Sequence, residues 1–249
     1  MKPEIALALL LVAGHLIGDF VLQPGRIAAG KRRFPVMLLH GAIVFLVSAL
    51  AAWPFWSARF LAALGLVAAL HLVVDGFKVR AAPSLRAFLL DQAAHLLLLA
   101  ALWRWMSPQG SPAGYSPWFG GMSPGSWFPL YVWSVVMVGL VGFNLIGGST
   151  LVRLALGPTV PSGAGRESLP ARGAMIGYLE RLMVMVLVLV GQWGVIGLVM
   201  AAKSLARFKD LDERGFAEYY LIGTLTSLLV AITAGMAAGW AMDLCRLVF

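Results

Sequence analysis

The sequence predicts an all-α fold, a polytopic integral membrane bundle of about seven transmembrane helices. Of its 249 residues, 60% are apolar and only 12% are charged, whereas soluble domains are about 45 to 50% apolar. The apolar residues also gather in runs of roughly 20, the length that crosses a bilayer as a helix. The single cysteine, Cys245, excludes an intrachain disulfide and a zinc site built from several thiolates.

Seven apolar runs are expected to span the membrane, and the first is expected to be a retained anchor because it is longer than the core of a cleavable signal peptide. The runs are 5–22, 36–53, 60–79, 86–105, 128–147, 175–202 and 217–246. Three regions are expected from these runs. Residues 1–105 form a four-helix membrane bundle, 106–127 an extracytoplasmic loop, and 128–249 the C-terminal membrane helices with a cytoplasmic loop at 150–174.

The basic residues predict the orientation and the partners. The formal net charge is +8, and most of the bases lie between the apolar runs, where they favour lipid headgroups over nucleic acid. Bases between the first and second runs and between the third and fourth predict cytoplasmic loops there. We therefore expect a multi-pass protein of the bacterial inner (cytoplasmic) membrane, with an outward N-terminus, membrane lipids as partners and no nucleic acid.

The sixth run conflicts with this orientation. Residues 203–214 carry four bases, yet a single crossing by residues 175–202 would place them outside. The run has 28 residues and is interrupted by Gly191, Gln192 and Gly194, which leaves room for a broken or re-entrant helix. The sequence leaves open whether the charge rule fails locally or the run does not cross once.

All four histidines lie in the first 95 residues, and three of them have an aspartate four positions away. That spacing places both side chains on one face of a helix. The predicted topology brings the three pairs, together with the lone His40, to one level near the cytoplasmic boundary. The pairs are His15 and Asp19, His71 and Asp75, and Asp91 and His95.

Carboxylates buried in a bilayer need a compensating cation, and imidazole with carboxylate suits zinc, manganese or ferrous iron. We therefore expect a divalent metal, with zinc preferred and manganese or iron as alternatives. Asp19 and Asp91 are also the expected catalytic residues. The competing interpretation is that the pairs form interhelical hydrogen bonds that only fix the packing. The expected ligands are a subset of His15, Asp19, His40, His71, Asp75, Asp91 and His95.

Two further groups of polar residues are candidates for function. Four residues beside the histidine layer are expected to bind substrate, although ordinary anchoring to headgroups is the favoured explanation of their basic members: Gln23, Arg26, Lys78 and Gln92. A second polar cluster, of unknown role, lies in the C-terminal half, where interfacial anchoring is the simpler interpretation: Glu180, Arg181, Lys203, Arg207, Glu218 and Tyr219.

Five sequence elements in order resemble the bacterial membrane proteins of domain-of-unknown-function family 3307, over roughly the first 105 residues. They are the run from His15 to Gln23, Leu39-His40-Gly41, the run from His71 to Asp75, Lys78, and the run from Asp91 to His95. A looser similarity is to membrane-embedded metal-dependent hydrolases, which also carry His and Asp at four-residue spacing. This chain lacks their His-Ser element, because Gly41 follows His40.

The leading functional hypothesis is a membrane-embedded metal-dependent hydrolase acting at the cytoplasmic face, with a lipid phosphate ester as the candidate substrate. The main alternative is a metal-ion or proton-coupled transporter or channel. The outer halves of the first four runs contain almost no polar residues, which favours a one-sided site. A third hypothesis is a membrane scaffold with structural histidine-aspartate pairs.

Overall fold

The computed structural model describes residues 1–106, 125, 127–157 and 170–246, and within these ranges it is helical with no β-strand. The described chain forms two compact units. The first is Met1–Gly142 with Trp240–Phe249, and the second is Phe143–Gly239. The all-α prediction is confirmed for the described residues.

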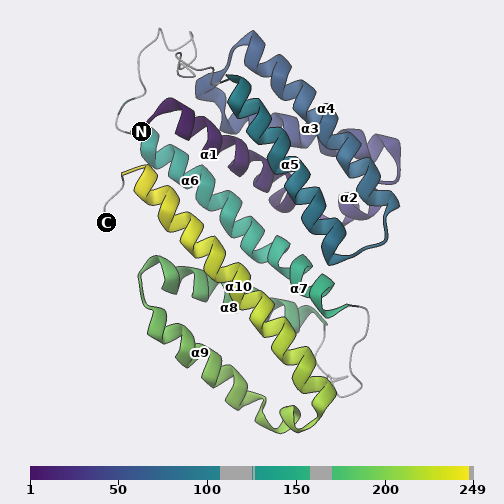
Figure 1. Cartoon of the computed structure of the whole chain (residues 1–249), viewed down its shortest axis with the longest axis vertical. Helices are drawn as coiled ribbons and strands as arrows, with labels where there is room; N and C mark the ends of the chain where they lie inside the picture. Colours follow the sequence, from purple (N-terminus) through teal and green to yellow (C-terminus); the bar gives the residue numbers. More distant parts are fainter. Residues whose placement is uncertain (107–124, 126, 158–169, 247–249) are drawn as a thin grey trace. The chain divides into compact units, whose positions relative to one another are not determined.

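The first unit is built around its N-terminal helix, which packs against α3, α5 and α6 (Figure 1). The helix α1 is interrupted near its end by a π-helical turn, η1, in which the Leu22 amide donates to the Ile17 carbonyl five residues back at 2.9 Å. The unit contains α1 (Pro3–Leu16), η1 (Ile17–Val21), α2 (Gly25–Gly30), α3 (Phe34–Ala51), the 3₁₀ turn η2 (Trp53–Phe55), α4 (Ala58–Arg80), α5 (Leu85–Met106) and α6 (Trp127–Gly142).

Small residues allow α1 to approach its neighbours closely. A Cβ atom on Gly14 would lie 2.8 Å from the Cα of Ser48, and one on Gly18 would lie 3.2 Å from the Cα of Val44. The spacing of these two glycines is the small-xxx-small pattern of membrane helix pairs. The close contact between α1 and α3 therefore depends on the absence of a Cβ atom at Gly14 and Gly18.

The outer surfaces of these helices are apolar, whereas the polar side chains lie inside. Leu46, Leu90 and Leu97 are 56%, 72% and 71% exposed, which is the reverse of a soluble protein. Six helices of the described chain are long and apolar enough to cross a membrane: Pro3–Val21, Phe34–Ala51, Ala58–Arg80, Leu85–Met106, Trp127–Leu156 and Arg214–Leu244. The expected count of about seven is not confirmed.

In the second unit, the expected sixth span, residues 175–202, is two helices rather than one. The chain breaks at Gly191, whose φ of 72° is a left-handed conformation that favours glycine. The elements of this unit are the π-helical turn η4 (Phe143–Gly147), α7 (Gly148–Leu156), α8 (Pro170–Leu189), α9 (Trp193–Ala206), the 3₁₀ turn η5 (Phe208–Asp212) and most of α10 (Arg214–Leu244).

The two helices on either side of Gly191 form an antiparallel hairpin. Lys203 donates a 2.6 Å hydrogen bond to Glu180, and the two residues lie about equally far from Gly191 along the chain. Val188 and Ile196, which belong to one buried apolar cluster, are likewise placed about symmetrically around it. The broken-helix alternative therefore describes this segment. Most of the expected loop 106–127 lies outside the described residues. Of the expected loop 150–174, residues 158–169 lie outside them, whereas the rest belongs mainly to α7 and α8, so the loop is shorter than expected.

Candidate metal centre

The first unit brings all seven expected metal ligands into one buried cluster. His15 comes from α1, Asp19 from η1, His40 from α3, and the other two pairs from α4 and α5. Each of the seven residues is between 0% and 7% exposed. Asp19 lies in the π-helical turn, a rare distortion that is frequent at functional sites.

Four atoms form the tightest part of the cluster: Nε2 of His40, Nε2 of His71, Oδ1 of Asp19 and Oδ2 of Asp75. The two nitrogens are 3.1 Å apart. The Asp19 oxygen lies 3.3 Å from His40 and 3.4 Å from His71, and the Asp75 oxygen lies 3.3 Å and 3.5 Å from the same nitrogens. A tetrahedral zinc site with bonds of about 2.0–2.1 Å has edges of about 3.3–3.4 Å. Asp19, His40 and His71 form one group with separations of 3.1–3.4 Å, close to the size of one face of such a site, and Asp75 lies beside the two histidines of that group.

The remaining members of the cluster lie beside these four atoms. His95 stacks on His71 with ring centroids 3.9 Å apart, and its Nδ1 is 3.9 Å from Asp91 and 4.0 Å from Asp19. Nε2 of His15 is also 4.0 Å from Asp19. Two more groups are close enough to share an ion: His15, His71 and His95, and Asp75, Asp91 and His95, each with ligand atoms within 4.8 Å of one another.

Two lysines neutralise two of the three carboxylates. Lys31 donates to Oδ2 of Asp75 at 2.7 Å, and Lys78 donates to Oδ2 of Asp91 at 2.5 Å. Among the described residues, Asp19 forms no ion pair with a lysine. Lys31 is only 6% exposed, although its place in a basic run between two apolar segments predicts an ordinary cytoplasmic anchor. Nothing in that run distinguishes Lys31 from Arg32 or Arg33, so sequence reasoning missed it.

Several buried polar atoms of the cluster have no hydrogen-bond partner within the described part of the chain. Unpartnered buried polar atoms are rare in folded proteins, and an ion or a water is one explanation for them. They are Nε2 of His15, Oδ1 of Asp19, Nδ1 of His40, Oδ1 of Asp75, Oδ1 of Asp91 and both ring nitrogens of His95.

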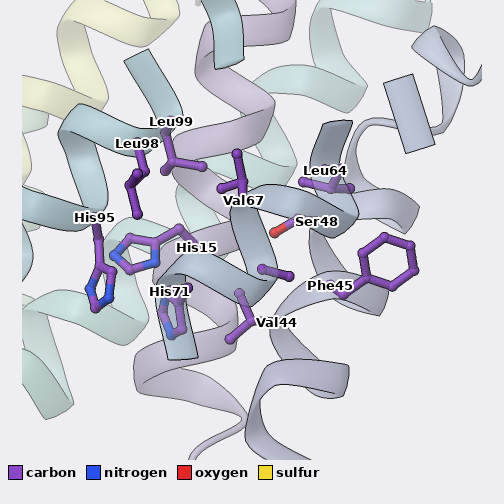
Figure 2. A pocket seen from close by; sticks show the side chains of 11 residues that line it. His15, Val44, Phe45, Ser48, Leu64, Val67, His71, His95, Leu98 and Leu99 are labelled. Atoms are coloured by element: carbon purple, nitrogen blue, oxygen red, sulfur yellow. The ribbon is translucent and has the colours of Figure 1, made fainter. Parts of the chain in front are cut away.

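A small cavity of about 20 Å³ opens beside the cluster, with room for one water molecule. Figure 2 shows the rings of His15, His71 and His95 on one side of it and mainly apolar side chains on the other. Ser48 is its one other polar lining residue. The buried polar side chains of the cluster therefore do not continue beyond this cavity, because its other lining residues are mainly apolar.

Of the four expected substrate-binding residues, two contact the cluster directly. Lys78 and Gln92 both donate to Asp91, the amide at 3.0 Å. The Lys78 side chain is 32% exposed, so the cluster reaches the protein surface here. The side-chain oxygen of Gln23 is buried without a hydrogen-bond partner in the described ranges. The side chain of Arg26 lies outside the described part.

The second expected cluster does not form one site in the described structure. Glu180 and Lys203 pair across the hairpin, while Arg207 pairs with Asp210 and Glu218 with Arg214 at the surface. Tyr219 is half-buried.

Arg181 has a structural role that its sequence position does not reveal. It is 3% exposed and donates through Nε to the Asn144 carbonyl at 2.8 Å and through Nη2 to the Leu145 carbonyl at 3.0 Å. Both carbonyls belong to the π-helical turn η4. The Asn144 amide donates back to the Arg181 carbonyl at 3.0 Å. Sequence reasoning missed Asn144, although a lone amide inside an apolar run is a usable signal.

Comparison with known proteins gives one match. Residues 6–115 match the model of a family described as a protein of unknown function, DUF3307. This match supports the resemblance noted from the sequence, and the matched segment contains all seven candidate metal ligands. No curated protein and no solved structure matches the chain.

Proposed function

We propose that this chain binds a divalent metal ion, preferably zinc, and acts as a metal-dependent hydrolase in a membrane. The observation that carries the proposal is the group of three ligand atoms from Asp19, His40 and His71, whose separations of 3.1–3.4 Å suit three vertices of a tetrahedral site, with Oδ2 of Asp75 at 3.3 Å and 3.5 Å from the two histidines. Lys31 then has the role of an outer partner that fixes a ligating carboxylate.

The chemistry of such an ion supports hydrolysis. A bound divalent metal polarises a phosphoryl or acyl oxygen and lowers the pKa of a bound water to about 7. Asp91 lies on the side where Lys78 approaches the surface, so it is the carboxylate nearest to an entering substrate. A lipid phosphate ester suits this position because Lys78 supplies a cation beside the cluster. A bacterial inner membrane, with the site at its cytoplasmic face, remains part of the proposal.

Transport is the less favoured function. A path through the bundle needs polar groups beyond the cluster, and the cavity beside the histidines is closed by apolar residues such as Leu64 and Leu99. The unsatisfied atoms also argue against a purely structural role for the pairs, since packing alone would leave them better hydrogen-bonded.

The test is metal analysis and turnover with His40→Ala protein. Full-length protein purified in detergent should hold zinc stoichiometrically, and His40→Ala should lose more than about a hundredfold in zinc affinity, because even outer partners are worth about 10- to 100-fold. Zinc-loaded wild type should release phosphate from phosphatidic acid or a polyprenyl phosphate, and the variant should not. Asp243→Asn, at an exposed position, is the control and should match wild type.

Two results would count against the proposal. Wild type that holds no zinc, manganese or iron after loading removes the metal centre. Stoichiometric metal without turnover, but with uptake of the ion into sealed vesicles, replaces hydrolysis with transport.

A further inference from the structure

We infer that the cluster holds a second divalent cation, on Asp75, Asp91 and His95, with the Asp75 carboxylate shared between the two ions. This inference rests on the proposed metal centre and adds a site to it. One ligand atom from each of the three residues lies within 4.8 Å of the other two. The residues come from α4 and α5 and are 0%, 4% and 1% exposed.

The unpartnered polar atoms of these side chains point to a bound ion. Oδ1 of Asp75, Oδ1 of Asp91 and both ring nitrogens of His95 are buried and have no hydrogen-bond partner in the described structure. A buried histidine with neither nitrogen bonded is costly without a ligand. The three residues together offer the mixed nitrogen and oxygen donors that zinc and manganese accept.

The two oxygens of Asp75 suit a bridging role. Oδ2 lies beside the two histidines of the first position and already accepts from Lys31, whereas Oδ1 is unpartnered. Carboxylate bridging is typical of two-metal hydrolytic sites, in which the ions lie about 3.5–4 Å apart. Asp75 can therefore bind the first ion with one oxygen and the second with the other.

The two positions differ in how close they lie to the protein surface, and this difference separates their roles. Asp19, His40 and His71 supply the first position, and all three are almost fully buried. Asp75, Asp91 and His95 supply the second and leave a vertex for water or substrate, as catalytic sites do. The second position is also next to Lys78, the partly exposed member of the cluster. A phosphate oxygen that enters beside Lys78 meets the second ion before the first.

Manganese supplies two independent readouts of this inference. Full-length protein in detergent is loaded with Mn²⁺ alone and freed of excess ion by gel filtration. Elemental analysis should give two manganese ions per chain. Electron paramagnetic resonance should show an exchange-coupled pair, since ions that share a carboxylate at this separation interact magnetically.

Variants then assign the second ion to its ligands. Asp91→Asn and His95→Gln should each retain one manganese ion, with the six-line spectrum of an isolated ion. Lys78→Met removes no proposed ligand and should retain two, as should the remote Asp243→Asn. Gel filtration and thermal unfolding check that each variant is folded, and the wild-type spectrum decides the matter if neither ligand variant folds.

The outcomes separate this inference from the proposed function. One uncoupled ion per wild-type chain overturns the second site and leaves the metal centre standing. Two ions that survive in Asp91→Asn and in His95→Gln also overturn it. No ion in wild type removes both proposals.

Discussion

At the scale of single residues, Lys31 shows how a surface-type residue is recruited into a buried cluster. Its ammonium and the Asp75 carboxylate are both almost fully buried and 2.7 Å apart. Removing one partner of such a pair leaves the other charge uncompensated, which costs about 3–5 kcal/mol.

Lys31→Met should therefore lower the free energy of unfolding of the metal-free protein by about 3–5 kcal/mol. The loss should shrink when zinc is added, because the ion supplies the positive charge that Asp75 has lost. Thermal unfolding in detergent, with a chelator and then with zinc, measures both effects.

Lys209→Met, a change at an exposed lysine, is the matched control and should be neutral in either condition. If zinc restores none of the stability lost in Lys31→Met, then Asp75 is not a ligand of that ion.

The sequence indicates that these seven residues gather in one place, because helical spacing and burial constrain the same residues. The four-residue spacing of His71 and Asp75 is local, so it survives folding unchanged. The contact between Lys31 and Asp75 joins the residue that follows α2 to α4, and no local sequence pattern encodes that contact. The exchange of hydrogen bonds between Asn144 and Arg181 is non-local in the same sense.

At the scale of elements, the crossing of α1 and α3 depends on the absence of a side chain at Gly14. A Cβ there would meet the backbone of Ser48 at 2.8 Å, and backbone cannot move aside as a flexible side chain can. Because α1 carries His15 and α3 carries His40, this crossing also sets the distance between two ligand-bearing helices.

Gly14→Ala should destabilise the protein by about 1–3 kcal/mol through overpacking and should weaken zinc binding as well. Gly197→Ala is the control, since a Cβ at this glycine within α9 meets nothing within 4 Å. It should be neutral or slightly stabilising, by up to about 1 kcal/mol. Equal thermal unfolding midpoints for the two variants would contradict the close-packing argument.

The π-helical turns are elements that sequence reasoning does not reach. Both η1 and η4 lie in continuous apolar runs whose period is that of an ordinary α-helix. The role of each turn is visible only in the folded structure. The turn η1 places Asp19 in the cluster of candidate metal ligands, and two carbonyls of η4 accept hydrogen bonds from Arg181.

At the scale of the whole molecule, the hairpin of α8 and α9 bears on the conflict in the predicted topology, because we expect it to enter and leave a membrane on one side. A hairpin that enters and leaves the membrane on one side adds no crossing. In that arrangement we expect the basic segment 203–214 on the same side as the C-terminal end of α7, as the charge rule requires.

Cysteine labelling tests this topology. In a Cys245→Ser background, Arg153→Cys and Lys209→Cys should react with a membrane-impermeant maleimide from the same side. Arg59→Cys, in the first turn of α4, should react from the opposite side. If Lys209→Cys is labelled together with Arg59→Cys, the segment 175–202 crosses the membrane after all.

The fold class was predictable because composition and run length express the same requirement, that backbone and side chains suit hydrocarbon. The break at Gly191 was visible as an interruption but could not be resolved, since a glycine inside an apolar run is compatible with either a kink or a reversal. The ion pair across the hairpin, from Lys203 to Glu180, distinguishes the two.

The lysines on Asp75 and Asp91 bear on how such a protein is made. A carboxylate that already has a cation of the chain itself can enter the lipid phase before any metal arrives. If the proposed metal centre forms, assembly in the membrane and acquisition of the ion can then be separate events, in that order. The metal would be delivered to a finished bundle, and a cell short of that metal would accumulate folded, inactive protein rather than lose it to degradation.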